Sequence, residues 1–260
     1  MLNENTTVLI MAAGTGGHVF PALSIAQKLQ EHNIQTEWMG THQGMENRLL
    51  EGAGIRIHAV SAKGLRGKGI AGLITAPFML GQALIQSMRI LLKVKPDCVL
   101  GMGGFVSGPG GLAAKLTGRK LVIHEQNAVP GFTNKLLAKI ADQVFEAFPN
   151  TFSKSEKVIH TGNPLRKEIA GLALRNRSFK EASRPLQILV LGGSQGALAI
   201  NEVVPELLAD WPEDNRPSVR HQTGDNTLEK TQEAYRGRGL SLSKRIDVLP
   251  FISGMAEAYI

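Results

Sequence analysis

Three glycine-rich segments of the sequence each follow a short apolar run, an arrangement typical of phosphate-binding loops in α/β proteins. They span residues 14–18, 101–111 and 192–196. Glycine permits positive φ angles and close approach of a ligand to the backbone, and the helix that follows presents unpaired N–H groups to an anion. A phosphate or diphosphate group is the expected ligand. The alternative is that these glycines only allow close packing at strand-to-helix turns.

The glycine spacing disfavours two common nucleotide-binding motifs. The P-loop pattern G-x-x-x-x-G-K-S/T is absent from the sequence. The first segment reads Gly14-Thr15-Gly16-Gly17-His18-Val19, with valine in the last place of the dinucleotide fingerprint G-x-G-x-x-G. A nucleotide kinase and a simple dehydrogenase therefore become weaker candidates.

His18 directly follows the first glycine segment, at the edge of the predicted sheet where ligands of this fold class bind. A histidine there can take up a proton near neutral pH or donate a hydrogen bond to a phosphate group. The alternative is a histidine at a helix start that bonds only to the backbone.

A second polar set, His124-Glu125-Gln126-Asn127, stands at the end of another apolar run. Four polar residues where a buried strand opens into a loop favour a functional site over a core position. Arg166 ends a further segment, Asn163-Pro164-Leu165-Arg166, and can reach a phosphate group unless it is an ordinary surface arginine. Because H-x-x-x-H spacing and paired cysteines are missing, no metal site is predicted.

The elements that must position these residues alternate between strand and helix. Apolar runs predict strands at 7–11, 36–39, 56–60, 97–101, 121–124 and 143–145. Helical stretches are predicted at 21–32, 46–52, 70–92 (where Pro77 can interrupt the helix), 110–116 and 133–139. This alternation predicts an α/β fold with a parallel sheet covered by helices on both faces.

The opening pattern of strand, small-residue turn and helix returns at residue 188. We therefore predict two tandem Rossmann-like domains, at 1–166 and 188–260, joined by a polar linker region at 167–187. The second domain is expected to hold three strands, at 188–191, 218–222 and 245–249, with helices at 198–209, 227–236 and from 253 onward. A matching domain needs about five or six strands, so we expect the second domain to be truncated at its C-terminus.

The positive charge of the chain is concentrated in its first part. The net charge is +7, and residues 1–166 hold 17 Lys+Arg against 10 Asp+Glu, whereas residues 167–260 hold 12 of each. Such an excess indicates nucleic acid, a membrane surface or an anionic ligand. It flanks an uncharged stretch, 69–88, whose glycines, proline and polar residues favour lying on a membrane over crossing it. The single cysteine and the absence of a signal-like start predict a reducing cytosol.

Six motifs, taken together, closely resemble the MurG family, the bacterial UDP-N-acetylglucosamine:lipid I N-acetylglucosaminyltransferases of peptidoglycan synthesis. They are GTGGHVFPAL (14–23), GLRGKG (64–69), GMGGFVSGPGGLAA (101–114), HEQN (124–127), GNPLR (162–166) and GGSQGA (192–197). The resemblance implies the GT-B fold, in which two Rossmann-like domains face a cleft and the second mostly binds the sugar nucleotide. It also implies an inverting transfer that forms lipid II through a β1→4 link, without a metal ion or another cofactor.

The same resemblance assigns roles to residues of this sequence. His18 is the expected general base, and Glu125 is either the alternative base or the residue that orients the acceptor. Contacts to UDP-N-acetylglucosamine are expected from Thr15, Gly16, Gly17, Asn127, Arg166, Ser194 and the backbone of Ile252. The acceptor diphosphate is expected at Gly14, Gly103, Gly104, Ser107 and Gly108.

Membrane binding is expected from the basic region and the uncharged stretch together. The residues expected to face an anionic membrane are Arg66, Lys68, Ile74, Phe78, Arg89 and Lys93. The expected partners are UDP-N-acetylglucosamine, undecaprenyl-linked lipid I and the anionic cytoplasmic face of the inner membrane, with no nucleic acid. Localisation is expected to be peripheral.

Two departures from the family pattern qualify these expectations. Ala13 stands where the family commonly has glycine, which affects only the local loop provided that its φ stays negative. The segments that grip the uracil, ribose and glucosamine are expected to be missing, so residues 1–260 alone should show little or no transferase activity.

Two alternatives remain. Another GT-B enzyme acting on a UDP-sugar, such as an epimerase or a diacylglycerol glucosyltransferase, is disfavoured by the HEQN and GMGGFVSGPGG motifs. A nucleic-acid-binding module could use the basic region, but that region lacks the interleaved aromatic residues typical of such proteins.

Overall fold

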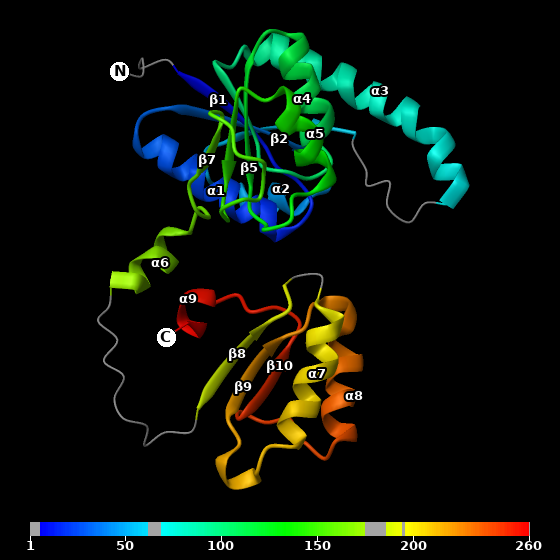
Figure 1. Cartoon of the computed structure of the whole chain (residues 1–260), viewed down its shortest axis with the longest axis vertical. Coiled ribbons are helices and arrows are strands. Elements are labelled where there is room, and N and C mark those ends of the chain that lie inside the picture. Colours follow the sequence, from blue (N-terminus) through cyan, green and yellow to red (C-terminus); the bar gives the residue numbers. More distant parts are fainter. Residues whose placement is uncertain (1–5, 62–68, 175–185, 194–195, 260) are drawn as a thin grey trace. The chain divides into compact units, whose positions relative to one another are not determined.

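The chain folds into two compact units, Met1–Arg166 and Lys167–Ile260. The computed structural model describes residues 6–61, 69–174, 186–193 and 196–259, with only the backbone at 69–74 and 173–174. Each unit is built around a parallel sheet (Figure 1). The predicted α/β architecture of two tandem Rossmann-like units is therefore confirmed.

The first unit contains a seven-stranded sheet with the order β3-β2-β1-β4-β5-β6-β7, and all neighbouring strands are parallel. The strands are β1 (Thr7–Met11), β2 (Gln35–Thr41), β3 (Arg56–Val60), β4 (Cys98–Gly101), β5 (Lys120–Glu125), β6 (Gln143–Glu146) and β7 (Val158–His160). Because the strand order reverses between β1 and β4, the chain leaves their carboxyl ends in opposite directions, and ligands of this fold class bind at such a place. The glycine loops at 14–18 and 101–111 both begin at this switch point.

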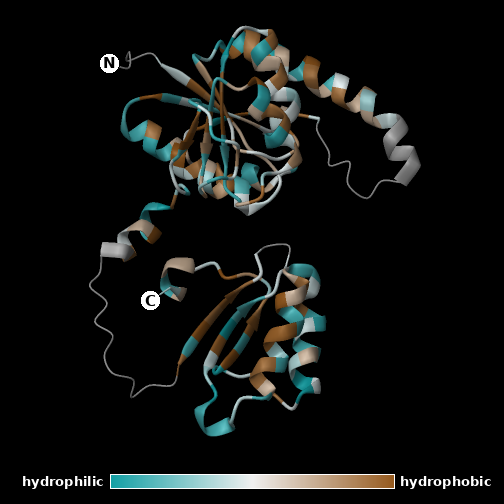
Figure 2. Cartoon of the chain, viewed as in Figure 1, coloured by the Kyte–Doolittle hydropathy of each residue, from teal (hydrophilic) through white to brown (hydrophobic). Residues whose placement is uncertain are grey.

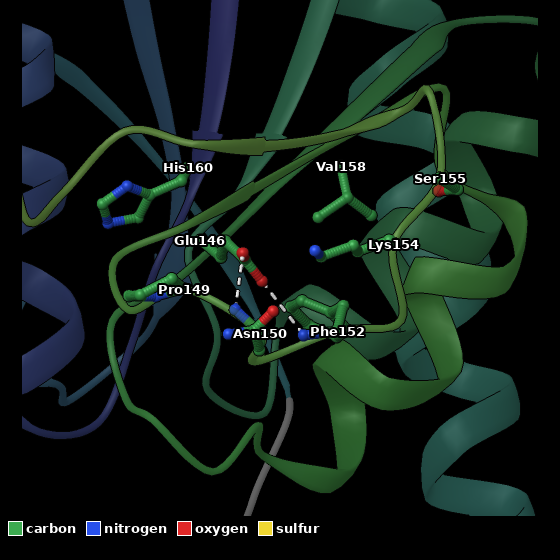
Figure 3. A pocket seen from close by; sticks show the side chains of 8 residues that line it. All are labelled: Glu146, Pro149, Asn150, Phe152, Lys154, Ser155, Val158 and His160. Carbon is green, nitrogen blue, oxygen red and sulfur yellow. Dashed lines mark hydrogen bonds between the residues drawn. The ribbon is translucent and has the colours of Figure 1, made fainter.

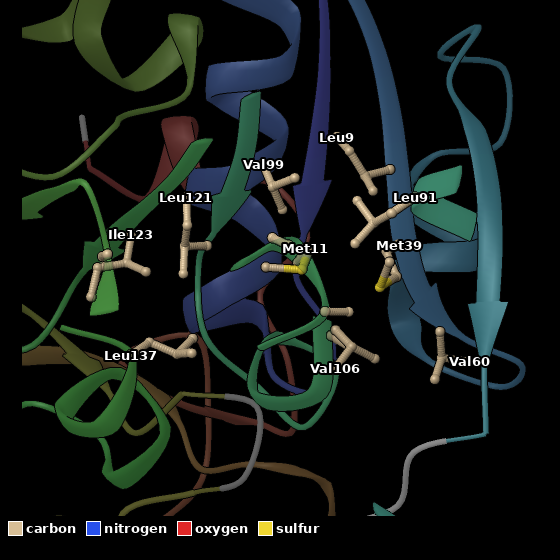
Figure 4. Packing of buried hydrophobic residues seen from close by; sticks show 14 of the residues in the cluster. Leu9, Met11, Met39, Val60, Leu91, Val99, Val106, Leu121, Ile123 and Leu137 are labelled. Carbon is tan, nitrogen blue, oxygen red and sulfur yellow. The ribbon is translucent and has the colours of Figure 1, made fainter. Parts of the chain in front are cut away.

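Helices cover both faces of this sheet. They are α1 (Gly16–Glu31), α2 (Met45–Leu49), α3 (Gly69–Val94), α4 (Ser107–Leu116) and α5 (Phe132–Ile140). One core cluster packs strand residues such as Leu9 and Leu121 against Leu91 of α3 and Leu137 of α5 (Figure 4). The other packs Trp38 and its neighbours against α1. These two cores fix the strand ends from which the site loops emerge.

Three elements of the first unit differ from the prediction. Helix α1 begins at Gly16, five residues before the predicted start, because the glycines that weaken the helical pattern lie in its first turn. Helix α3 runs through Pro77 without a break, since a proline removes one backbone hydrogen bond and the rest of a long helix can compensate. Strand β7 was not predicted, because only Val158 and Ile159 are apolar in a three-residue strand.

The second unit contains a three-stranded parallel sheet with the order β10-β9-β8. Its strands are β8 (Gln187–Leu191), β9 (Ser218–Gln222) and β10 (Ile246–Leu249), and its α-helices are α6 (Lys167–Ala170), α7 (Leu198–Ala209), α8 (Leu228–Gly237) and α9 (Met255–Ala258). Short 3-10 helices span Gly171–Leu174, Glu213–Asn215 and Asp225–Thr227. The start of the predicted linker is thus helical, and its residues 175–185 lie outside the described part of the chain.

Candidate functional site

The first glycine loop leads from buried β1 directly into α1. Gly14 has a φ of +100°, and Thr15 is the N-cap of a helix that begins at Gly16. The backbone N–H of His18 already bonds to the Thr15 carbonyl. The N–H groups of Gly16 and Gly17 have no partner within a helix that starts here, so they can bind an anion.

His18 ends the first glycine loop, and its side chain packs on the second one. Its Nδ1 is 3.4 Å from Thr15 Oγ1. Its ring covers Gly103, where a Cβ atom would lie 2.5 Å from His18 Cδ2. Burial lowers the pKa of His18, and the negative charge of Glu125 opposes this shift. The imidazole is therefore neutral near pH 7 and able to accept a proton.

The second glycine loop contacts the first one closely. Gly103 and Gly104 have φ angles of +104° and +82°, and a Cβ at Gly104 would collide with the Ala13 carbonyl. The buried Ser107 hydroxyl lies 2.7 Å from the Gly103 oxygen and 3.1 Å from the Met11 oxygen, and it accepts a hydrogen bond from the Gly103 N–H. Ser107 therefore joins the two loops, and its hydroxyl is not turned toward a ligand.

The remaining expectations for this loop pair concern Gly108 and Ala13. Gly108 is half-buried inside α4, where a Cβ would lie 3.5 Å from Thr133 Cγ2. Among the described residues, Ala13 is not one of the non-glycine residues with positive φ. Alanine therefore replaces glycine at this position without backbone strain.

Glu125 stands at the end of β5 and is buried. Its Oε1 accepts hydrogen bonds from the backbone N–H and the side-chain amide of Asn127, at 3.0 and 2.9 Å. Its Oε2 accepts from the Gly131 N–H at 3.1 Å and from the Asn134 amide at 2.9 Å. Four donors surround the carboxylate, so its geometry suits holding the loop after β5 and presenting Asn127 rather than accepting a substrate proton.

The neighbouring His124 links this loop to the segment that ends at Arg166. Its Nε2 donates to the Gly162 carbonyl and its Nδ1 accepts from the Gln126 amide, each at 3.1 Å. Asn163 in turn donates to the Gln126 carbonyl at 3.1 Å. Burial lowers the pKa of His124, so it remains a neutral structural residue. The structure thus brings the HEQN and GNPLR motifs side by side.

The predicted residues of the second unit are separate from this set in the sequence. Ser194 lies outside the described residues. Ile252 is buried, and its backbone N–H donates to Gln222 Oε1 at 3.0 Å. A ligand at that N–H would have to replace the Gln222 side chain.

Glu46 was missed by the sequence reading because buried carboxylates are rare. It is fully buried, and its Oε1 accepts from the Thr41 N–H at 2.7 Å and from the Thr41 hydroxyl at 2.8 Å. Side chains at Gly40 or Gly44 would collide with the carboxylate. The signal in the sequence is the spacing Gly40-Thr41-x-x-Gly44-x-Glu46. Thr41 donates to the Glu46 carboxylate, and the two glycines leave the space that this carboxylate fills, so the loop after β2 is held in place.

In the second unit, a buried polar network lies beside Gly192 and Gly196, the described ends of the third glycine segment. His221 Nδ1 is 3.0 Å from the Tyr235 hydroxyl, and its Nε2 is 3.1 Å from Asn201 Oδ1. Burial lowers the pKa of His221 to about 4. Asn201 also donates to the Thr223 carbonyl at 3.0 Å, next to the glycine at position 196.

An open cavity of about 520 Å³ lies beyond the ends of β6 and β7 (Figure 3). The Glu146 carboxylate lies in it and accepts from the Asn150 and Phe152 N–H groups, each at 3.0 Å. None of the predicted site residues lines it. The candidate site is therefore identified by the polar groups that follow β1, β4 and β5 and not by this cavity.

Comparison with known proteins identifies the family of the chain. Residues 8–146 match the glycosyltransferase family 28 N-terminal domain, and residues 187–260 match the glycosyltransferase family 28 C-terminal domain. A relative from Pseudomonas savastanoi pv. phaseolicola is 50% identical over 255 residues, which cover 98% of the chain and 70% of the relative. The chain belongs to glycosyltransferase family 28, in its MurG branch.

Curated relatives in the MurG branch share one descriptive name. The proteins from Pseudomonas savastanoi and Ectopseudomonas mendocina, both 50% identical, are each a UDP-N-acetylglucosamine–N-acetylmuramyl-(pentapeptide) pyrophosphoryl-undecaprenol N-acetylglucosamine transferase. The crystal structure of Acinetobacter baumannii MurG matches 97% of the chain and 68% of its own length, with 43% identity and a TM-score of 0.68. The Staphylococcus aureus MnaA–UDP structure, at 15% identity and a TM-score of 0.65, shares the fold.

Exposed apolar side chains gather on the helices of this MurG-branch chain that follow β3, β4 and β5. Figure 2 shows hydrophobic residues along α3. The three helices α3, α4 and α5 are neighbours and contain no acidic residue. Their exposed apolar side chains are Phe78, Leu80, Ile85 and Leu92 of α3, Leu112 and Leu116 of α4, and Phe132, Leu136 and Ile140 of α5.

Other residues expected to face a membrane are described only in part. Arg89 and Lys93 are exposed. Arg66 and Lys68 lie outside the described residues, as does the side chain of Ile74. Among the helices that the structure describes, none has the length and apolar content that spanning a membrane requires.

Over the described ranges, no group of three His, Cys, Asp or Glu residues is arranged to hold a metal ion.

Proposed function

We propose that this chain carries the acceptor-binding unit and part of the donor-binding unit of an enzyme that transfers N-acetylglucosamine from UDP-N-acetylglucosamine to lipid I, forming lipid II. The observation that carries the proposal is 50% identity over 98% of the chain to relatives named for that transfer. The neutral, half-buried His18, whose ring packs on the second glycine loop, supports it, because the transfer needs a base beside an anion-binding site.

The reaction is a single displacement with inversion. His18 removes the proton from the muramoyl 4-OH as that oxygen forms a bond to C1 of N-acetylglucosamine. The bond from C1 to the phosphate oxygen breaks, and UDP leaves with the electron pair, which gives the β1→4 link. The charge of Glu125, which raises the pKa of His18, stabilises the imidazolium that forms.

The two substrates are assigned to different sets of residues. Gly14, Gly103, Gly104 and the first turn of α4 face the acceptor diphosphate, with Ser107 shaping that loop. The donor is bound by Thr15, Gly16, Gly17, Asn127, Arg166, Ser194 and the backbone of Ile252. N–H groups at helix starts and the Arg166 guanidinium stabilise the leaving diphosphate without a metal ion or cofactor.

A lipid-linked acceptor requires access to a membrane. The apolar side chains of α3, α4 and α5, together with Arg89 and Lys93, form the membrane-facing surface of the enzyme. Arg66 and Lys68 are proposed to contribute to it from their place in the sequence alone. The protein is peripheral at the anionic cytoplasmic face of the inner membrane, and nucleic acid is not a partner.

The relatives extend beyond the part that the chain matches, since the chain covers 70% of their length. We expect residues 1–260 alone to turn over little or no substrate, because the segments that the family uses to bind the uracil, ribose and glucosamine are expected in the part of the relatives that the chain does not match. An extended chain, joined to the remaining C-terminal segment of the Pseudomonas savastanoi relative, should be active.

Product analysis tests this function. Radiolabelled UDP-N-acetylglucosamine and lipid I are incubated with residues 1–260 and with the extended chain, and the products are separated by chromatography. The extended chain should form lipid II with a β1→4 link, and residues 1–260 should form almost none. Release of free N-acetylmannosamine or transfer to diacylglycerol would contradict the assignment, and rapid turnover by residues 1–260 would contradict the expected inactivity.

A further inference from the structure

Phe20 and Arg166 lie together although they are far apart in the sequence. The guanidinium carbon of Arg166 lies over the Phe20 ring, 5.0 Å from its centroid. Within about 6 Å a guanidinium is attracted by the negative face of an aromatic ring. Both residues are half-buried, so this contact is less screened by water than one on the open surface. The ring therefore restricts where the guanidinium can lie.

The Phe20 ring is itself held against the first turn of α1. A Cβ atom at Gly16 would lie only 3.0 Å from Phe20 Cε2 and 3.1 Å from its Cδ2. The ring thus covers Gly16, one turn before Phe20 in the helix. Because Gly16 and Gly17 supply the unpaired N–H groups of this helix end, Phe20 brings the Arg166 guanidinium to the same end.

The segment that carries Arg166 is also fixed at its other end. His124 donates to the Gly162 carbonyl, and Asn163 donates to the Gln126 carbonyl, both at 3.1 Å. Residues 162–166 are thus attached to the HEQN loop at their start and to α1 through Arg166 at their end. The contact with Phe20 therefore helps to hold the end of the segment that carries the guanidinium.

We propose that Phe20 is a positioning residue that holds the Arg166 guanidinium beside the first turn of α1, so that the guanidinium and the Gly16 and Gly17 N–H groups together bind one diphosphate ester. This inference rests on the proposed function, which brings diphosphate esters to this helix end. The nucleotide and the lipid-linked acceptor share this chemistry, and a planar guanidinium suits either one. Phe20 acts through Arg166 and touches neither substrate.

The positioning itself can be measured without a ligand. In the NMR spectrum of the unaltered chain, the Arg166 Nε–H signal should be shifted upfield by the ring current of Phe20. Phe20→Leu should abolish this shift, and Phe20→Tyr, which keeps the ring, should preserve it. An Arg166 signal that is the same in the Leu variant would overturn the inference.

Binding is then measured by titrating the extended chain with UDP and, separately, with farnesyl diphosphate, while the Gly16 and Gly17 amide signals are followed. Uridine and farnesol, which lack the diphosphate group, serve as blanks. Phe20→Leu should weaken binding of at least one ester by about 3-fold to 10-fold, the range expected for a half-buried cation–π contact, whereas Phe20→Tyr restores it. The ester that shows the effect identifies which substrate Arg166 binds.

Two controls separate positioning from a general structural effect. Phe152→Leu removes another half-buried aromatic ring of the same unit, next to the β6–β7 cavity, and should leave binding unchanged. Phe20→Leu should add nothing to the loss caused by Arg166→Gln, because both substitutions remove the same guanidinium contact. Additive losses, or unaltered binding in Phe20→Leu, contradict the inference alone. Failure of the unaltered extended chain to bind either ester contradicts the proposed diphosphate site as well.

Discussion

At the scale of single residues, the candidate site depends on the balance of two effects on His18. Burial lowers its pKa, and the nearby negative charge of Glu125 raises it, with burial the larger effect. Four hydrogen bonds hold the Glu125 carboxylate in place. The carboxylate can therefore stabilise a protonated His18 without moving or taking up the proton itself.

Replacing Glu125 by Gln should lower the pKa of His18 further, because the imidazolium loses a favourable negative neighbour while its burial remains. The pKa is read from the pH dependence of the His18 ring signals in NMR spectra. Glu146→Gln is the matched control, since Glu146 is also buried and accepts two backbone N–H groups of a loop. A His18 pKa that rises or stays constant in Glu125→Gln would contradict the account.

Gly103→Ala should displace the His18 ring, because the new Cβ would lie 2.5 Å from Cδ2 at a residue with a φ of +104°. A loss of about 1–3 kcal/mol in unfolding free energy is expected from strain and collision together. Gly118→Ala tests strain alone, since Gly118 has a φ of +69° and open space around its Cβ position. The account would be contradicted if both variants lost the same unfolding free energy and left the His18 signals unchanged, because a Cβ at position 103 would then not collide with the His18 ring.

At the scale of elements, strand ends place residues from distant segments at one edge. The apolar runs at 7–11 and 121–124 are clear in the sequence, so the positions of His18 and Glu125 just after them could be predicted. The uses of the Ser107 hydroxyl and the Ile252 N–H could not be, because both depend on contacts with distant residues, Met11 and Gln222. Glu46 differs, since its partner Thr41 is only five residues away, and it was not predicted because carboxylates are rarely fully buried.

The second unit should lose stability in acid through His221. Its pKa is about 4 in the folded unit and about 6.5 when unfolded, so the unfolded state binds more protons between these values. The unfolding free energy should therefore fall on the order of 3 kcal/mol as the pH decreases from 7 to 4. Urea unfolding, followed through NMR signals of β8 and β9, measures it. His221→Gln should remove most of this dependence, and an equally steep pH dependence in that variant would contradict the assignment.

At the scale of the whole molecule, the net positive charge and the exposed apolar side chains of α3, α4 and α5 belong to the first unit. Residues 167–260 carry equal numbers of basic and acidic residues, so the net charge of +7 arises from residues 1–166. An acid-free surface on α3, α4 and α5 that combines apolar and basic side chains suits an anionic membrane better than nucleic acid.

Replacing Arg66, Lys68, Arg89 and Lys93 together by Gln should weaken binding to vesicles that contain anionic phospholipid. Each basic residue near the membrane surface contributes about 1 kcal/mol, so the affinity for the vesicles should fall by more than about tenfold. The difference in affinity should shrink at high salt. The matched control replaces four basic residues of the second unit, Arg236, Arg238, Lys244 and Arg245, and should retain binding. Equal losses in both variants, measured by vesicle cosedimentation, would contradict a membrane surface on the first unit.

The role of His18 as the base is the central claim, and turnover measures it most directly. In the extended chain, His18→Ala should lower kcat by about 10²-fold to 10⁴-fold, the usual contribution of a general base, and leave the Kd for UDP-N-acetylglucosamine nearly unchanged. Formation of lipid II under saturating substrate gives kcat, and equilibrium titration gives Kd. Turnover within a few fold of the unaltered extended chain would contradict the account.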